Sequence, residues 1–204
     1  MVRHIQGSDD VTVCVVANRA YGHRYDAALI EREKGACLTA KELLGYHVLL
    51  FLDLPDEQLD HSQIKLIVPL EEVVARVQPA IAYLPHPGDL NQDHRAVFQA
   101  ALVACRPQGS PVKIIRVYEV PSSTDQVPAL GPWPFLPNYY VDISGVLDLK
   151  IKALGCYEAE SHPFPHPRSP EGLVALGRKR GMEVGLEAAE AFMGLREVWE
   201  RPRT

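Results

Sequence analysis

The chain has 204 residues, a length that fits one α/β domain with a sizeable hydrophobic core. Its hydrophobic fraction is 47% and its formal net charge is −5 with acidic and basic residues mixed, so it offers no basic surface for nucleic acid or an anionic membrane. No apolar run is long enough for a membrane span and the first residues lack the apolar stretch of a signal peptide, so we expect a cytoplasmic protein.

The first half of the chain alternates short apolar runs with longer amphipathic stretches. Residues 11–17 are β-branched and continuously apolar, which predicts a strand covered on both faces. Gly45 follows the first amphipathic stretch and is a typical helix-ending residue. The expected elements are a strand over 11–17, a helix over 26–44, a strand over 48–52, a helix over 62–77 and a strand over 80–84.

The second half continues this alternation and adds long polar loops. Long loops in α/β domains often border a binding site. The expected segments are a polar loop over 85–93, a helix over 94–105, a strand over 113–120, a loop rich in Pro and Ser over 121–138, a helix over 146–157, a Pro-rich loop over 161–169 and a mostly helical segment over 171–199.

Alternating strands and helices predict an α/β fold of the Rossmann-like kind, with a parallel sheet and helices on both of its faces. In such sheets ligands bind beyond the carboxyl ends of the strands. This rule selects the loops that start near Asn18, Pro85 and Pro121. We find no internal repeat or interdomain linker, so we expect residues 1–204 to form a single domain.

The most informative loop follows the expected strand over 80–84. The loop and the first residue of the next helix contain His86, Asp89, Asn91, Asp93 and His94. Asp93 is placed to cap the helix, and His94 falls on the helix stripe that faces the sheet. Neutral imidazole is a good zinc ligand, and a neighbouring carboxylate can hold it in place.

A structural explanation fits the same residues. An aspartate followed by a histidine at a helix start is often only a cap and a histidine bonded within the protein. A catalytic zinc also needs three protein ligands, whereas this loop supplies at most two, His86 and His94. Spacing alone therefore leaves the metal site and the structural interpretation both open.

Residues 86–96 read H-P-G-D-L-N-Q-D-H-R-A, and this stretch resembles the second motif of the LmbE/PIG-L deacetylases. Other stretches match bacterial members of that family in the same order along the chain. They cover residues 118–124, 137–143, 150–157, 164–169 and 180–192. The resemblance extends over nearly the whole chain, and the ordered set is more specific than any single piece.

The resemblance implies a Zn²⁺ ion and the hydrolysis of an N-acyl (acetyl) group on an amino sugar or sugar conjugate. His94 matches the zinc-binding histidine of the second motif, and Asp93 matches the acidic residue before it. Asn91 stands where other members often have a histidine that acts on the substrate, and His86 is the alternative for that role.

Further contacts to the sugar substrate are expected from the predicted loops. The candidates are Asn18, Arg24, Glu119 and His166, and an ordinary surface role is the alternative for each. Members of the family often form oligomers, so a homo-oligomer is expected as a possible state, with the Pro-rich loop around His166 as a candidate interface.

The family's first motif, A-H-P-D-D-E, has no counterpart in the chain, whose only paired aspartates are Asp9 and Asp10 in an expected turn. We therefore expect a domain that is incomplete at its N-terminus and lacks the family's first, central strand. His94 would be the one confident zinc ligand, and activity of the chain as it stands would be impaired. The alternative is a non-catalytic relative that binds a sugar conjugate or a partner.

Overall fold

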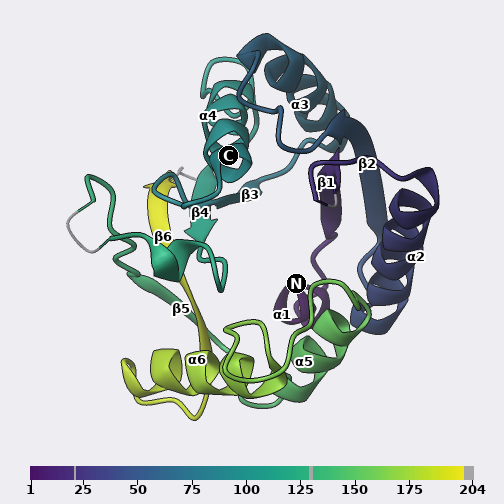
Figure 1. Cartoon of the computed structure of the whole chain (residues 1–204). Coiled ribbons are helices and arrows are strands. Elements are labelled where there is room, and N and C mark those ends of the chain that lie inside the picture. Colours follow the sequence, from purple (N-terminus) through teal and green to yellow (C-terminus); the bar gives the residue numbers. More distant parts are fainter. Residues whose placement is uncertain (21, 129–130, 200–204) are drawn as a thin grey trace. The chain divides into compact units, whose positions relative to one another are not determined.

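A computed structural model describes residues 1–20, 22–128 and 131–199 (Figure 1). The chain divides into two compact units. The first unit comprises Met1–Glu57 and Tyr140–Glu190, and the second comprises Gln58–Tyr139 and the residues from Ala191 onward.

Among its described residues, the first unit has a parallel pair of strands and four helices, besides parts of two strands given below. Thr12 pairs with Val48 across the strands. The second helix begins at Asp26, whose carboxylate accepts hydrogen bonds from two backbone N–H groups, and ends at Gly45, which has a left-handed φ of 77°. The elements are α1 (Val2–Gln6), β1 (Thr12–Asn18), α2 (Ala27–Leu44), β2 (Val48–Pro55), α5 (Leu147–Gly155) and α6 (Pro170–Met182).

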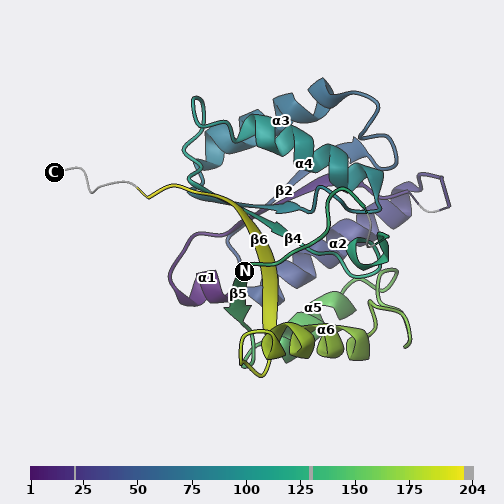
Figure 2. The ribbon, with the colours of Figure 1, turned by 90° about the vertical axis from the view of Figure 1, so that its left-hand side faces the viewer.

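The second unit places two helices beside a parallel pair of strands. Ile81 of one strand lies opposite Ile114 of the other. The two helices contact each other, as Figure 2 also shows, and their apolar sides bury residues such as Leu66 and Phe98. The elements are α3 (Gln63–Val77), β3 (Ile81–Pro85), α4 (Gln92–Ala104), β4 (Ile114–Tyr118) and a single 3₁₀ turn, η1 (Thr124–Gln126).

Two further strands, β5 (Tyr139–Asp142) and β6 (Ala189–Glu197), each contribute residues to both units. The strand order is β3-β4-β6-β5, and β6 runs antiparallel to β4, with Ile114 opposite Glu197. The expectation of a wholly parallel sheet is therefore wrong, because this sheet is mixed.

The expected helix over 171–199 is also wrong beyond Met182, where the chain turns and continues as β6. At the start of β6, Ala189 and Ala191 are buried while Glu190 and Phe192 are more exposed, which is the period of two that a strand requires. Residues such as Ala, Glu and Met favour helices locally, and sheet pairing overrides that preference here.

The remaining expectations for secondary structure are confirmed in outline. Each strand and helix predicted up to residue 120 is present within a few residues of its expected bounds, and α3 accommodates Pro69. The α/β class is confirmed. Among the described residues, no helix combines the length and apolar character that a bilayer crossing demands.

Gly181 in α6 approaches backbone closely, which gives a test of the packing in the first unit. A Cβ at this position would lie 2.5 Å from the carbonyl oxygen of Leu186, an atom that cannot swing away as a side chain can. At Gly35 in α2, the same Cβ would have no heavy atom within 4 Å. We expect Gly181→Ala to lower the free energy of unfolding by about 1–3 kcal/mol. Gly35→Ala should raise it by about 1 kcal/mol, since alanine is the better helix former. Denaturant unfolding curves measure both, and effects of the same sign would contradict the close approach.

Candidate functional site

The candidate site lies in the second unit, in the loop that follows β3. Because β3 and β4 are parallel, their carboxyl ends lie at the same edge of the sheet. The loop after β3 carries His86 and Asp89, and the segment after β4 leads through Glu119 to η1. This edge is where the rule for parallel sheets places ligands.

The centre of the loop is the carboxylate of Asp89, which is 1% exposed. It accepts a hydrogen bond from the Thr124 hydroxyl at 2.6 Å, from the backbone N–H of Asn91 at 2.8 Å and from the Ser123 hydroxyl. Its Oδ1 atom also lies 3.2 Å from Nδ1 of His94. The carboxylate thus joins the loop after β3 to the start of α4 and to the turn after β4.

The ionisation of Asp89 follows from these contacts. Burial by itself raises the pKa of a carboxyl group, but the hydrogen bonds from His94, Ser123 and Thr124 outweigh burial and bring the pKa of Asp89 down to about 2. Asp89 is therefore a carboxylate at every pH near neutrality, although it is fully enclosed.

His94 is the third residue of α4, and its side chain is 32% exposed. Its Nδ1 atom is buried and lies 3.2 Å from the Asp89 carboxylate, a close contact that falls short of a well-formed hydrogen bond. The other ring nitrogen, Nε2, receives no hydrogen bond from the described part of the chain. One imidazole nitrogen thus lies against a carboxylate, and the other is open among the described residues.

His86 differs from His94 in its surroundings. It is 1% exposed, its ring packs against that of Phe135 with 5.2 Å between centroids, and neither of its ring nitrogens has a partner within the described residues. Burial lowers the pKa of His86, against the opposing effect of the Asp89 and Glu119 carboxylates. Buried polar atoms without partners are rare in folded proteins and point to a functional use.

The start of α4 differs from the sequence expectation. Its cap is Asn91, whose side-chain oxygen accepts from the backbone N–H of Asp93 at 2.8 Å, so the expected capping role of Asp93 is wrong. Asp93 points inward, is 4% exposed, and accepts from the backbone N–H of Leu59 at 3.2 Å. Asparagine and aspartate cap helices about equally well, so the sequence could not show which of the two would do so.

Two other contacts shape the loop. The guanidinium of Arg95 donates to the carbonyl oxygens of Asp89 at 2.6 Å and of Leu90 at 2.7 Å. The backbone of Trp133 approaches Gly88 so closely that a Cβ at position 88 would overlap it. Glycine is required there because the loop and the segment around Trp133 share that space.

The remaining candidates are divided between the units. Glu119 lies directly after β4 in the second unit, close enough to influence His86. Asn18 ends β1, Arg24 is exposed, and the His166 ring lies 4.3 Å from that of His162 between centroids with a tilt of 52°, all in the first unit. Substrate contacts by these residues stay predictions.

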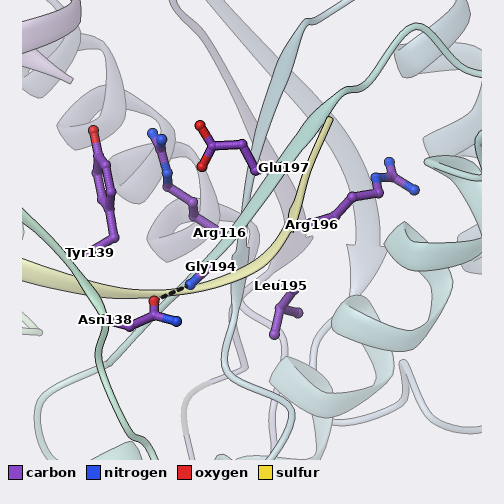
Figure 3. Close-up of a pocket in the computed structure, with 7 residues that line it drawn as sticks. All are labelled: Arg116, Asn138, Tyr139, Gly194, Leu195, Arg196 and Glu197. Carbon is purple, nitrogen blue, oxygen red and sulfur yellow. Dashed lines mark hydrogen bonds between the residues drawn. The ribbon is translucent and has the colours of Figure 1, made fainter. Parts of the chain in front are cut away.

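The second unit also contains a cavity of about 260 Å³ beside β6, which Figure 3 shows. The guanidinium of Arg116 lies there, 3.5 Å from the centroid of the Tyr139 ring and within hydrogen-bond distance, 3.1 Å, of the Tyr83 hydroxyl. The Gly194 N–H donates to the side-chain oxygen of Asn138 at 2.7 Å. None of the predicted site residues lines this cavity.

The described structure does not bring together a full set of protein ligands for a zinc ion. A catalytic zinc takes three protein ligands, commonly His, Cys, Asp or Glu. Over residues 1–20, 22–128 and 131–199, no three such side chains are grouped to hold a metal. His94 offers a suitable nitrogen, but the described residues do not form a zinc site by themselves.

Comparison with known proteins adds the family. Residues 1–105, just over half of the chain, match the PIG-L family, described as GlcNAc-PI de-N-acetylase. The matched part includes β3 and the loop that carries His86, Asp89 and His94. The chain belongs to the PIG-L family of N-deacetylases.

One relative matches in sequence over a shorter stretch. It is the uncharacterized deacetylase YaiS of Escherichia coli K12, which is 33% identical over 89 residues. The match covers 41% of this chain and 46% of YaiS, so it spans about half the length of that relative.

Solved structures of similar fold extend over the whole chain. The conserved protein TT1542 from Thermus thermophilus has a TM-score of 0.76 at 20% identity, over 100% of this chain and 89% of that one. The N,N'-diacetylchitobiose deacetylase of Pyrococcus horikoshii has a TM-score of 0.74 at 18% identity, and the match covers 96% of this chain and 76% of that one. The 4-carboxy-2-hydroxymuconate hydratase GalB of Pseudomonas putida KT2440 has a TM-score of 0.76 at 18% sequence identity. That match covers 100% of this chain and 91% of GalB. A deacetylase and a hydratase share this fold, so the fold alone does not identify the reaction.

The ionisation of Asp89 predicts how stability depends on pH. Its pKa in the folded chain, about 2, lies below the ordinary value of 3.8, so its ionised form stabilises the fold above about pH 4 and this contribution disappears as the pH falls towards 2. We expect Asp89→Asn to lower the free energy of unfolding at pH 7, with the difference from wild type shrinking between about pH 4 and 2.

Denaturant titrations in metal-free buffer at a series of pH values measure this difference. Asp125→Asn, at an exposed residue of η1, is the matched control and should change the free energy of unfolding by less than about 0.5 kcal/mol. A difference for Asp89→Asn that stays constant down to pH 2 would contradict the hydrogen bonding described here.

Proposed function

We propose that this protein acts in the hydrolytic removal of an N-acetyl group from an amino sugar or a sugar conjugate. The observation that supports this most directly is the PIG-L match over residues 1–105, which contains the loop from His86 to His94. The placement of that loop at the carboxyl edge of a parallel strand pair adds support, since such edges bind ligands.

In this proposal His94 is one ligand of a zinc ion, through its open Nε2 atom. The His94 side chain is partly exposed, and Nε2 has no competing partner among the described residues. The other ligands that a catalytic zinc requires are not supplied by any grouping of described side chains. Among the described residues, His94 is therefore the one ligand assigned to the zinc ion.

His86 is proposed as the group that exchanges a proton with the substrate. Its ring is buried, both of its nitrogens are without partners in the described structure, and burial favours its neutral form. A neutral imidazole can accept a proton at one nitrogen and release one at the other, which is what an amide hydrolysis requires at the leaving amine. Glu119 lies near enough to stabilise the protonated ring when it forms.

Asn91 and Asp93 receive smaller roles than the resemblance implies. Asn91 uses its side-chain oxygen to cap α4, and an amide carries no proton that it can give to a leaving group. The Asp93 carboxylate holds the backbone of Leu59, so its effect on the site is expected to act through the position of the helix start.

A non-catalytic relative that binds a sugar conjugate is the second candidate. The absence of three grouped metal ligands among the described residues favours it. The two candidates differ in zinc content and in turnover, and they share the ability to bind a sugar.

Zinc analysis and an amine-release assay over a panel of N-acetyl sugars test the proposal on the 204-residue chain. One zinc per chain with amine release supports hydrolysis, saturable sugar binding without either supports the second candidate, and the absence of all three contradicts both. For a hydrolase we expect His94→Ala to abolish turnover and His86→Gln to lower kcat by about 100-fold. His61→Ala, at a histidine whose side chain is 69% exposed, is the control and should leave activity unchanged.

A further inference from the structure

The donors around Asp89 determine the protonation of the neighbouring histidine ring. The N–H of Asn91 can only donate, so the Asp89 oxygen that faces it, Oδ1, must accept. The same Oδ1 atom is the one that lies 3.2 Å from Nδ1 of His94. An unprotonated Nδ1 would turn its lone pair towards the carboxylate oxygen at that distance, so the contact favours a hydrogen on Nδ1.

The second oxygen of the carboxylate cannot supply that hydrogen. The Thr124 hydroxyl accepts a hydrogen bond from the Val120 N–H at 2.8 Å and directs its own proton to Oδ2 of Asp89 at 2.6 Å. Asp89 is thus surrounded by donors on both oxygens, which leaves it without a proton of its own. A carboxylate in this state acts on the imidazole purely as an acceptor.

The backbone of the turn after β4 is shaped to deliver these hydroxyls. Ser122 has a positive φ of 69°, a conformation that residues other than glycine rarely adopt. The turn places the next two side chains, Ser123 and Thr124, against Asp89. An unfavourable backbone conformation of this kind persists where surrounding contacts enforce it. Here those contacts include the hydrogen bonds from Ser123 and Thr124 to the Asp89 carboxylate.

We propose that Asp89 is the positioning residue of the site, which fixes His94 in the tautomer protonated at Nδ1 so that Nε2 presents its lone pair outward. This inference rests on the proposed function, which explains why the tautomer matters. A metal ion or a proton can bind His94 only through the free lone pair of Nε2. Asp89 touches neither substrate nor reacting atoms and acts through the histidine.

Nitrogen NMR of the histidine rings tests the tautomer directly. The full chain is labelled with ¹⁵N-histidine in metal-free buffer at about pH 8, and the His94 signals are assigned by their loss in His94→Gln. The expected spectrum of wild type shows a protonated Nδ1 and an unprotonated Nε2 for this ring. A wild-type ring protonated at Nε2 would overturn the proposal, whatever the protein does with sugars or zinc.

Variants separate positioning from simple stabilisation. Asp89→Ala removes the acceptor and should convert most of His94 to the tautomer protonated at Nε2, whereas Asp89→Asn keeps an amide oxygen and should restore much of the wild-type pattern. Thr124→Val removes one of the hydrogen bonds to the carboxylate but leaves the contact with His94, so it should lower stability without altering the tautomer.

A different result is expected if Asp89 only stabilises the loop and does not fix the tautomer of His94. In that case Asp89→Ala and Thr124→Val would leave the ring in the same state, or would change it alike. If Asp89→Ala does not fold, the wild-type spectrum still tests the proposal, because a ring protonated at Nε2 overturns it, and Asp89→Asn should keep the wild-type tautomer. None of these measurements depends on turnover, so failure of the deacetylase assay and failure of this proposal remain distinguishable.

Discussion

The hydrogen bonds that converge on one buried carboxylate organise the candidate site. Asp89 receives donors from its own loop, from the start of α4 and from the turn after β4. A charge taken out of water is tolerated only when such donors replace the lost hydration. The shape of the loop and the charge of Asp89 therefore depend on each other, and the orientation of His94 depends on both.

The sequence predicted the α/β class and most of the elements, because their signals are local. Continuous apolar runs, the cap at Asp26 and the stop at Gly45 all act within a few residues. The failures lie where distant pairing decides, at β5 and at β6, whose residues after Met182 lie in a sheet despite a helical preference. The expected absence of a first motif and first strand stays a prediction.

The site was predictable in part for the same reason. The run of His, Asp and Asn after the third strand identified the right loop, and the structure brings His86, Asp89 and His94 together there. The role of Asp89 was not predictable, since its partners Ser123 and Thr124 lie 34 and 35 residues further along the chain. No local pattern reports such a contact, although the hydroxyl run after the fourth strand is visible in the sequence.

The unpartnered ring of His86 has a consequence for how this loop evolves. An imidazole enclosed beside Phe135 with two nitrogens unsatisfied by the described residues costs folding free energy that an aliphatic side chain of similar size would not. Selection for folding stability alone would therefore replace His86 with an aliphatic residue. Under the proposed role of His86 in proton exchange, a lineage that keeps histidine there accepts a weaker core in exchange for that role, and a lineage without turnover is free to lose it.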